Sequence, residues 1–368
     1  MAISANLWGG NCQSSESTLH QLAPYIGKMK SAMARCLIKS FTQPGDLILD
    51  PFVGSGVVVL ESLILNRGII CCDINPYAIT LTKAKLNAPL TLEEALTKSR
   101  EYLSCMEKTS HLACLDSVPN WVKQFFHPKT LQEIITLAEL LRTNKEHFLL
   151  ACLLGILHHQ RPGFLSFPAS HLVPYLRTQK FPEENYPELY ACRDVASRLE
   201  NKIRRVYRRF PKINHHLLKE CIQYDAASLN LPAESVDAII TSPPYMNALS
   251  YGRDNRLRLW FLGVNDYHYY DQIVPRNQKE FHCLMSRCLM TFQRVLRAKG
   301  VCVLVLGEIK KAKEVINTAQ LVIEIATKEI GGYNYEEVVG DAIPDIRRAR
   351  KGVAGVKQEW IVVLRKKG

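Results

Sequence analysis

The chain has 368 residues, of which 47% are apolar and 22% are charged, with a formal net charge of +12 at pH 7. These proportions are those of a globular protein with a sizeable core, and they argue against an intrinsically disordered chain. No run of 18 consecutive apolar residues occurs, and no basic segment followed by an apolar core opens the chain, so we expect neither a membrane span nor secretion. The excess of positive charge favours a polyanionic partner.

Apolar runs and helical patterns alternate in the first quarter of the chain. Residues 29–42 carry apolar side chains at helical spacing, and a Pro-Gly turn at 43–46 leads to a short apolar run at 47–50. A glycine-bearing turn, a helix at 57–66, a second apolar run at 69–73 and a helix at 76–86 follow. Strands and helices that alternate at this spacing predict the start of a parallel α/β sheet.

The alternation stops between residues 91 and 216. Helices are predicted at 131–141, 146–158 and 188–209, whereas five prolines between 162 and 187 exclude one continuous element there. Strands resume at 220–225 and 236–241, followed by a helix at 279–298 and strands at 301–306, 335–339 and 360–364. The sequence therefore predicts one catalytic domain, built from residues 1–90 and 217–368, with residues 91–216 as a mainly helical insertion.

A glycine-containing loop, Asp50-Pro51-Phe52-Val53-Gly54-Ser55-Gly56, joins the first strand to its helix. Its glycines allow a sharp turn and a close approach to a ligand. Asp73 ends the next strand about twenty residues later, where an acid can accept hydrogen bonds from ribose hydroxyls. The full GxGxxG of dinucleotide sites is absent, so we expect a nucleoside ligand. A tight turn that binds nothing is the alternative.

The segment Thr241-Ser242-Pro243-Pro244-Tyr245 directly follows the fourth strand. Two consecutive prolines give a rigid turn with outward-facing carbonyls. The Ser242 hydroxyl and the Pro243 carbonyl could accept the two N–H bonds of an exocyclic amino group, while Tyr245 stacks on its ring. Such a site would hold a weakly nucleophilic nitrogen in position for methyl transfer. An ordinary rigid turn is the alternative.

Together the two motifs resemble the amino-methyltransferase branch of the class I S-adenosylmethionine-dependent enzymes, which methylate cytosine N4 or adenine N6 in bacterial DNA. DPFVGSG is similar to the cofactor loop of this family, and TSPPY to its catalytic motif. The resemblance implies a Rossmann-like α/β fold with helices on both faces of a mostly parallel seven-stranded sheet. It also implies S-adenosylmethionine as cofactor, S-adenosylhomocysteine as product, and no metal. The chain has twelve cysteines but no CxxC pair, and we expect reduced thiols.

The resemblance assigns site residues one by one. Its catalytic residues are Ser242, Pro243, Pro244 and Tyr245. Its cofactor-binding residues are Tyr25, Lys28, Asp50, Pro51, Phe52, Gly54, Ser55, Gly56, Asp73, Ile74, Asn75, Asp225, Ala226 and Thr241. Among these, Tyr25 and Lys28 precede a helix where the family closes over the methionine end of the cofactor, and Asp225 ends the third strand, where the family contacts adenine.

A serine before the two prolines is typical of the cytosine-N4 enzymes of this family. The resemblance therefore implies methylation of cytosine N4 in a specific sequence of double-stranded DNA, with the target base flipped out. Adenine N6, an RNA base, and a non-catalytic nucleic-acid-binding protein are the alternatives. A cognate restriction endonuclease is a further partner that the resemblance allows. The expected location is the cytoplasm of a bacterium or archaeon, near the nucleoid and not in a membrane.

Basic side chains in the insertion and in two later segments are candidates for phosphate contacts. Arg198, Lys202, Arg205 and Arg209 recur at helical spacing and predict one basic stripe, for which a solvated face is the alternative. His158 and His159 end an apolar helix, where capping of the helix dipole competes with a contact to nucleic acid. The remaining candidates are Arg161, Arg253, Arg256, Arg347, Arg348, Arg350 and Lys351.

Overall fold

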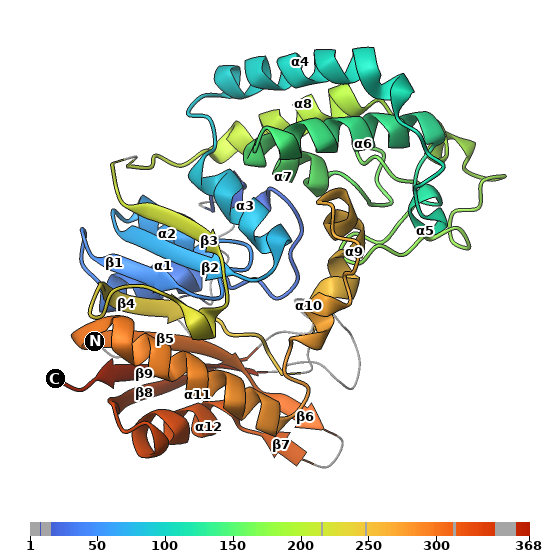
Figure 1. The fold of residues 1–368 in the computed structure, drawn as a ribbon. Helices are drawn as coiled ribbons and strands as arrows, with labels where there is room; N and C mark the ends of the chain where they lie inside the picture. The colour runs from blue at the N-terminus through green and yellow to red at the C-terminus, as the bar shows by residue number, and fades with distance from the viewer. Residues whose placement is uncertain (1–7, 9–15, 215, 247–248, 312–313, 343–357) are drawn as a thin grey trace.

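A computed structural model describes residue 8 and residues 16–214, 216–246, 249–311, 314–342 and 358–368 (Figure 1). Its centre is a seven-stranded sheet in the order β3-β2-β1-β4-β5-β9-β8. Five neighbouring strands run parallel, and β9 runs antiparallel to both β5 and β8. The strands are β1 (Leu47–Asp50), β2 (Gly68–Asp73), β3 (Lys219–Gln223), β4 (Val236–Thr241), β5 (Leu296–Gly307), β8 (Tyr333–Ala342) and β9 (Gln358–Lys366).

Helices cover both faces of this sheet. Successive residues of a strand point to opposite faces, so Ile48 of β1 packs in one core with α1 (Ser31–Phe41) and α2 (Val57–Ile64). Its neighbour Leu49 packs in a second core with α11 (Gln278–Val295) and α12 (Thr318–Glu324). The predicted fold class, a mostly parallel Rossmann-like sheet between helical layers, is therefore confirmed.

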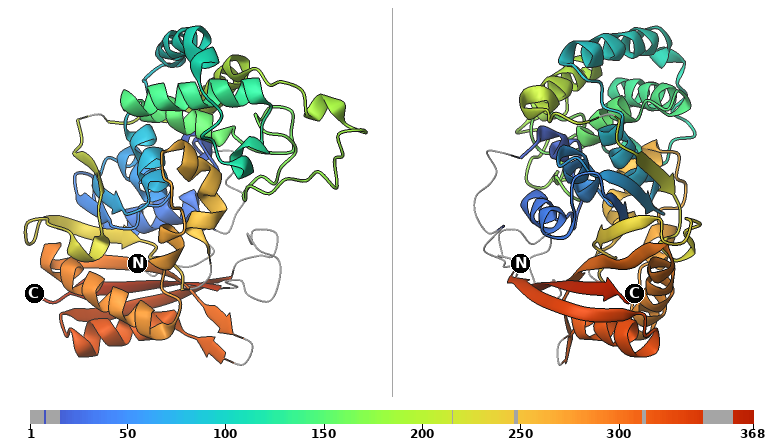
Figure 2. Two further views of the ribbon diagram at one scale, coloured as in Figure 1. Left: turned by 45° about the vertical axis from the view of Figure 1, so that its right-hand side comes forward. Right: turned by 90° about the vertical axis from the view of Figure 1, so that its left-hand side faces the viewer.

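The insertion between α3 (Pro76–Leu86) and β3 is mainly helical, as the sequence predicts, and lies at one end of the molecule (Figure 2). It contains α4 (Leu92–Thr109), α5 (Asn120–Lys123), α6 (Pro128–Thr143), α7 (His147–Gly155) and α8 (Val195–Val206). A capping box fixes the start of α4: Thr91 accepts from the Glu94 amide and Glu94 accepts from the Thr91 amide.

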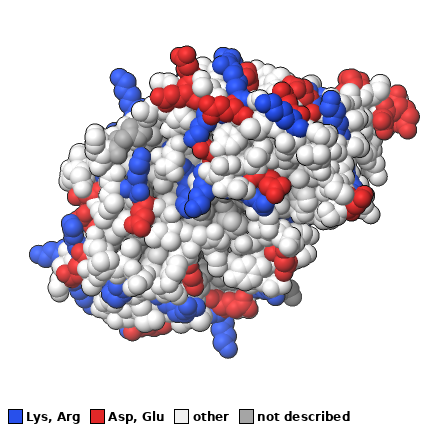
Figure 3. Space-filling view, turned by 45° about the horizontal axis from the view of Figure 1, so that its top comes forward, with Lys and Arg blue, Asp and Glu red and all other residues white. Residues whose placement is uncertain are grey.

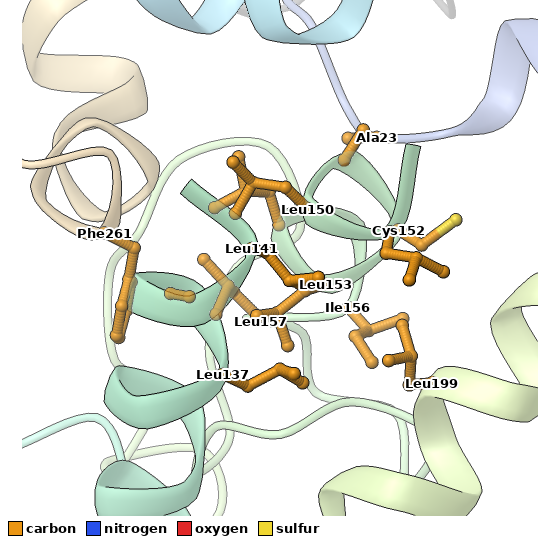
Figure 4. Packing of buried hydrophobic residues seen from close by; sticks show 14 of the residues in the cluster. Ala23, Leu137, Leu141, Leu150, Cys152, Leu153, Ile156, Leu157, Leu199 and Phe261 are labelled. Carbon is orange, nitrogen blue, oxygen red and sulfur yellow. The ribbon is translucent and has the colours of Figure 1, made fainter. Parts of the chain in front are cut away.

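The core of the insertion is continuous with that of the sheet's own helices. Side chains from α6, α7, α8 and α9 converge on one another (Figure 4). The same cluster includes Tyr77 and Leu81 of α3, together with Leu19 and Leu22 next to the 3-10 turn η3 (Thr18–Gln21). The insertion is thus packed onto the helices beside the amino-terminal half of the sheet and is not a tethered appendage.

Among the helix ends that differ from the prediction are the start of α8 and the end of α7. The helix expected from residue 188 begins only at Val195, because the Asp194 side chain caps it by accepting from the Ser197 amide. The helix expected to reach residue 158 ends at Gly155, and the chain beyond it pairs with a loop through the bonds Leu165 N to Ile156 O and Ser166 N to Leu157 O. The expectation that His158 and His159 cap this helix was therefore wrong.

Several further elements were not among those predicted from the sequence. They are α9 (Tyr251–Phe261), α10 (Tyr269–Gln272), a π-turn over Ile325–Glu329 and the hairpin β6 (Ile309–Lys311) and β7 (Glu314–Ile316). Every described cysteine is a free thiol. In the part of the chain that the structure describes, no helix has both the length and the apolarity needed to cross a membrane.

Candidate active site

A cavity of about 390 Å³ lies at the carboxyl ends of the parallel strands, where β1, β2 and β4 deliver their last residues. This is the edge at which open α/β sheets bind ligands. Of the residues that the sequence assigned to cofactor or catalysis, the cavity wall includes Tyr25, Lys28, Asp50, Pro51, Phe52, Gly54, Ser55, Asp73, Ile74, Asn75, Asp225, Ala226, Ser242, Pro244 and Tyr245. Gly56, Thr241 and Pro243 are not among the residues of that wall.

The glycine loop is shaped by positive φ angles at Gly54 (49°) and Gly56 (69°), a region that L side chains rarely adopt. The Gly54 amide donates to Oδ2 of Asp73 at 2.9 Å, which ties the first strand's loop to the end of the second strand. A Cβ on Gly56 would lie 2.8 Å from Oγ1 of Thr82, so this glycine allows α2 to pack closely on α3. Gly56 therefore shapes the site without lining it.

Asp73, the last residue of β2, lies on the cavity wall. Its two carboxylate oxygens accept from the amides of Gly54 and Asn75, each at 2.9 Å. Burial raises the pKa of Asp73 to about 6, although these backbone hydrogen bonds lower it. A carboxylate has about four lone-pair positions, so the group can still accept hydrogen bonds from two hydroxyls of a ribose.

Thr241 supports Asp50 from behind the cavity. The Thr241 hydroxyl is completely buried and donates to Oδ1 of Asp50 at 2.6 Å. Burial raises the pKa of Asp50 to about 7, and the Thr241 hydrogen bond opposes that rise. The sequence assigned Thr241 to direct cofactor contact; in the structure it does not line the cavity, and it orients a carboxylate, that of Asp50, which does.

Aromatic rings form the wall next to the amino-terminal segment. Tyr25 stacks on Tyr77, with ring centroids 5.8 Å apart, and lies 6.5 Å from the ring of Tyr251. A Cβ at Gly54 would lie 3.3 Å from the Tyr25 ring, so a side chain at this position would press against that ring. Lys28 donates from Nζ to the carbonyl of His20 at 3.3 Å.

Asp225, which follows β3, also lines the cavity. Its Oδ1 accepts from the Ala227 amide at 3.0 Å, and its Oδ2 lies 3.8 Å from an Nη atom of Arg287. Arg287 belongs to α11 and was not predicted, because a single arginine on an amphipathic helix carries no signal that it faces a ligand.

The turn that the sequence predicts to be catalytic, residues 242–245 (the catalytic turn), lies against the end of β5. The Ser242 hydroxyl is 3.1 Å from the Val305 carbonyl and 3.4 Å from the Tyr245 hydroxyl, to either of which it can donate. Tyr245 is nearly buried, with 8% of its surface exposed, and donates to Oε1 of Glu359 at 2.8 Å. Its ring lies on Gly307, where a Cβ would come within 2.6 Å of the ring. Tyr245 is thus held by β5 and β9, in addition to lining the cavity.

The wall facing the catalytic turn comes from α9 and α10. Tyr251, Tyr269, Tyr270, Ile273 and Val274 all line the cavity, and Tyr269 and Ile273 are exposed. Of the segment that follows the Pro-Pro-Tyr turn, Tyr251 lines the cavity. The Tyr267-His268-Tyr269-Tyr270 run was overlooked, although so dense an aromatic cluster in a polar stretch was the available signal.

Two residues predicted to bind phosphate are engaged inside the protein. Lys202 is 7% exposed and donates from Nζ to the Gln21 carbonyl at 2.6 Å, so it joins α8 to the amino-terminal turn. Arg256 places its guanidinium over the rings of Tyr175 and Trp121 and donates to the Pro174 carbonyl. Both assignments are corrected, because these cations already have partners within the protein. His158, 1% exposed, is likewise enclosed and pairs with the Ser170 carbonyl.

The other basic candidates lie at the surface. Arg161, Arg205, Arg209 and Arg253 are exposed, while Arg198 is half-buried and donates to the Asp194 carbonyl. Acidic and basic side chains are interleaved over the insertion (Figure 3), so the expected stripe is not an unbroken basic face. Arg347, Arg348, Arg350 and Lys351 lie outside the described residues.

The site fits a nucleoside that carries a charged amino-acid tail. Its volume lies within the usual range for small-molecule pockets. Among the described residues, the buried Ser55 hydroxyl and the Asn75 side-chain nitrogen have no hydrogen-bond partner, so the cavity wall holds donors that a ligand would satisfy. The described residues contain no cluster of three or more His, Cys, Asp or Glu side chains that could hold a metal ion. Fold and cavity are therefore those of a Rossmann-like α/β protein with a site of nucleoside size at the carboxyl ends of its parallel strands.

Comparison with known proteins finds a similarity in the amino-terminal part of the chain. Residues 4–84 match the family model described as DNA methylase, so over this segment the chain is similar to that family. A type II methyltransferase, M.MjaII of Methanocaldococcus jannaschii, is 31% identical over 68 residues. That stretch is 18% of this chain and only 13% of the relative's length.

Solved structures with similar folds are more distant. An S-adenosylmethionine-dependent methyltransferase from Methanosarcina mazei is 12% identical with a TM-score of 0.37, over 90% of this chain and 97% of that one. The rRNA methyltransferase AviRa of Streptomyces viridochromogenes is 12% identical with a TM-score of 0.35, over 99% of this chain and 96% of that one. Neither likeness bears on the substrate.

Proposed function

We propose that the chain transfers a methyl group from S-adenosylmethionine to the exocyclic N4 amino group of a cytosine in a specific DNA sequence. The observation that carries this proposal is the position of the Ser242 hydroxyl on the wall of the same cavity as Asp50 and Asp73. The hydroxyl donates its own proton to Val305 or Tyr245, so its lone pairs are left to accept an N–H of the target.

In this proposal the target base flips out of the duplex and enters the cavity between the catalytic turn and α10. The Pro243 carbonyl is the second acceptor, and the rings at the cavity mouth receive the unstacked base at a cost of a few kcal/mol for flipping. Asp73 holds the ribose of the cofactor, and the Tyr25 segment covers its methionine end. Holding both reactants in this geometry supplies roughly 7–11 kcal/mol of the barrier.

Recognition of the DNA falls to the insertion, residues 91–216, and to α9 in this proposal. Arg161, Arg205, Arg209 and Arg253 are exposed cations available for phosphate contacts. Adenine N6 is the second candidate, because a serine before the two prolines favours cytosine without excluding the larger base. The same family resemblance allows an RNA base as an alternative substrate. It also allows a cognate restriction endonuclease as a partner.

The test is methylation of unmodified plasmid DNA, and separately of total RNA, with isotope-labelled cofactor, followed by mass spectrometry of the nucleosides. N4-methylcytosine supports the proposal, and N6-methyladenine replaces it with the second candidate. Label only in RNA overturns DNA as the substrate. Cofactor binding by calorimetry without any labelled product, together with retained nucleic-acid binding, would leave a non-catalytic binding protein.

Two variants test the roles of the catalytic turn. Ser242→Ala and Tyr245→Ala are expected to lower turnover on the order of 10²-fold, as loss of a positioned transition-state donor or acceptor does, while cofactor affinity stays within about twofold. An equal loss of cofactor affinity in either variant would mean that the side chain belongs to the cofactor site.

A further inference from the structure

We propose that Glu359 of β9 receives, through the hydroxyls of Tyr245 and Ser242, the proton that the target amino group loses when it is methylated. The inference rests on the proposed function, which places that amino group at Ser242. It begins from three oxygen atoms in a row: the Ser242 hydroxyl is 3.4 Å from the Tyr245 hydroxyl, which donates to Oε1 of Glu359 at 2.8 Å.

The topology of the sheet brings these groups together. Glu359 is 114 residues beyond Tyr245, yet β9 lies next to β5, and Glu359 pairs directly with Gly307. Gly307 is also the residue on which the Tyr245 ring rests. Because β9 runs antiparallel to β5, the beginning of β9 lies beside the end of β5. Glu359, near the beginning of β9, therefore lies at the edge of the sheet where the catalytic turn is found.

The charges around Glu359 suit a proton acceptor. Asp341 faces it from β8, and Lys30 approaches from the start of α1. Lys30 and Asp341 pair with each other at 2.6 Å, and Asp341 also accepts from the Trp8 ring nitrogen at 3.0 Å. The Tyr245 hydroxyl is the donor that faces the Glu359 carboxylate in this group, with the hydroxyl of Tyr251 close by.

Burial raises the pKa of Glu359, the Tyr245 hydrogen bond and Lys30 lower it, and Asp341 raises it again. The carboxylate therefore has a higher proton affinity than an exposed glutamate, which makes it a better acceptor. Glu359 is also half-buried, so part of its surface remains open to solvent.

The step balances without a further reactant. The bond between nitrogen and the new methyl group forms as the donor's carbon–sulfur bond breaks, and the nitrogen is left with one proton too many. That N–H proton passes to Ser242, the Ser242 proton passes to Tyr245, and the Tyr245 proton passes to Glu359, while the N–H electron pair returns to nitrogen. Glu359 then loses its proton to water. Glu359 acts through two other side chains, so it is a positioning residue.

The first experiment needs neither cofactor nor DNA. The carboxyl carbons of glutamate are labelled with carbon-13, the Glu359 signal is assigned by its absence in Glu359→Gln, and its titration is followed by NMR. We expect a midpoint above the ordinary glutamate value and a higher one in Tyr245→Phe, because removing the phenol removes a hydrogen bond that lowers the pKa. An identical midpoint in Tyr245→Phe would overturn the contact and the relay with it.

The second experiment measures single-turnover methylation against pH. The wild-type rate is expected to fall as pH drops through the Glu359 midpoint, and Glu359→Gln, whose amide oxygen still accepts from Tyr245, is expected to lose this limb and to be slower by about 10²-fold. Tyr245→Phe keeps the ring and should show the same loss. Glu336→Gln removes an exposed carboxylate from β8 and serves as the matched control.

The outcomes separate the two proposals. Product from the wild-type protein, with both variants as fast as Glu336→Gln at every pH, contradicts the relay alone. An absence of product from the wild-type protein on any nucleic acid contradicts the proposed function itself. Circular dichroism and cofactor calorimetry on all variants identify a variant that has failed to fold, and the relay is then decided by the other one.

Discussion

At the scale of single residues, the site depends on contacts between groups far apart in the sequence. Tyr245 rests on the backbone of Gly307, and Asp50 is held by the hydroxyl of Thr241. Neither pair follows from a motif, because both contacts cross between neighbouring strands of the sheet. Each pair gives a prediction that separates a role in geometry from a role in binding.

Gly307→Ala should impair catalysis while leaving the cofactor bound. The new Cβ would lie 2.6 Å from the Tyr245 ring, so the ring must move away from its position on the cavity wall. A displacement of about 1 Å is expected to lower turnover on the order of 10²-fold, as misplacement in an active site does. Steady-state kinetics and calorimetry measure the two effects. Gly163→Ala has no atom within 4 Å of its Cβ and is the control, and turnover equal to that control would disprove the clash.

Asp50→Asn should stabilise the protein in a pH-dependent way and weaken cofactor binding. The folded-state pKa of Asp50, about 7, is above the unfolded value of about 3.9. Its contribution to stability is therefore fully present below pH 4 and is lost as pH rises to 7, where the buried carboxylate ionises. We expect a gain of about 1 kcal/mol at pH 8.5 in urea unfolding, shrinking as pH falls to 5.5.

The matched control for Asp50→Asn is Asp116→Asn, which neutralises an exposed carboxylate in the insertion. A gain in stability that did not depend on pH, or one equal to that of the control, would mean that ionisation of Asp50 is not what strains the folded state.

At the scale of elements, α9 lies between the catalytic turn and the insertion. Two of its arginines, Arg253 and Arg256, have different surroundings. Arg253 is exposed and donates to the Ser250 hydroxyl, whereas Arg256 is held between aromatic rings of the insertion. The sequence assigned both to phosphate contact, since a helix of mixed basic and aromatic residues does not reveal which side faces the protein.

Replacing the two arginines should therefore produce different defects. Arg253→Ala is expected to weaken DNA binding and to reduce the salt dependence of log K by about one unit, with stability unchanged. Arg256→Ala is expected to lower the free energy of unfolding by about 1–2 kcal/mol, because it loses two cation–π contacts and a hydrogen bond. Fluorescence anisotropy at several salt concentrations and urea unfolding measure these effects, and a reversed pattern would exchange the two roles.

The strands of the sheet and the helices next to the glycine loop were predictable from the sequence, whereas α9 and α10 were not. Strands such as Leu47–Asp50 are apolar because both faces of a parallel sheet are covered, and this leaves a pattern in the sequence. The helices α9 and α10 lie beside the cavity, and Tyr251 and Tyr269 line it. The positions of these aromatic residues in the sequence therefore follow the shape of the cavity and show no helical periodicity. The end of α7 was misplaced because the residues after Gly155 remain apolar although the helix has stopped.

At the scale of the whole molecule, the insertion shares one core with α2 and α3, the helices beside the amino-terminal half of the sheet. Leu153 of α7 is completely buried in the cluster that also contains Tyr77 of α3, the ring on which Tyr25 stacks at the cavity. This continuity predicts that the two parts unfold together and that damage in the insertion reaches the cofactor site.

Leu153→Ala should destabilise the entire chain by about 2–5 kcal/mol, the usual result of a cavity in a packed core. Hydrogen exchange is expected to show reduced protection of the amides of β1 and β4 along with those of α7. The exposed Leu112, replaced in the same way, should change stability by less than about 0.5 kcal/mol. Loss of protection confined to the insertion would instead show that the insertion unfolds by itself.

The sequence by itself determined the α/β class, the insertion, the glycine loop and the Ser242 turn, because strand periodicity and these turns are local properties that a few neighbouring residues specify. Tertiary structure alone decided that Thr241 supports Asp50, that Lys202 and Arg256 are held inside, and that Glu359 reaches Tyr245. Each of these contacts joins segments from different strands or helices. Their geometry follows from strand order and helix packing, which no local pattern of residues encodes.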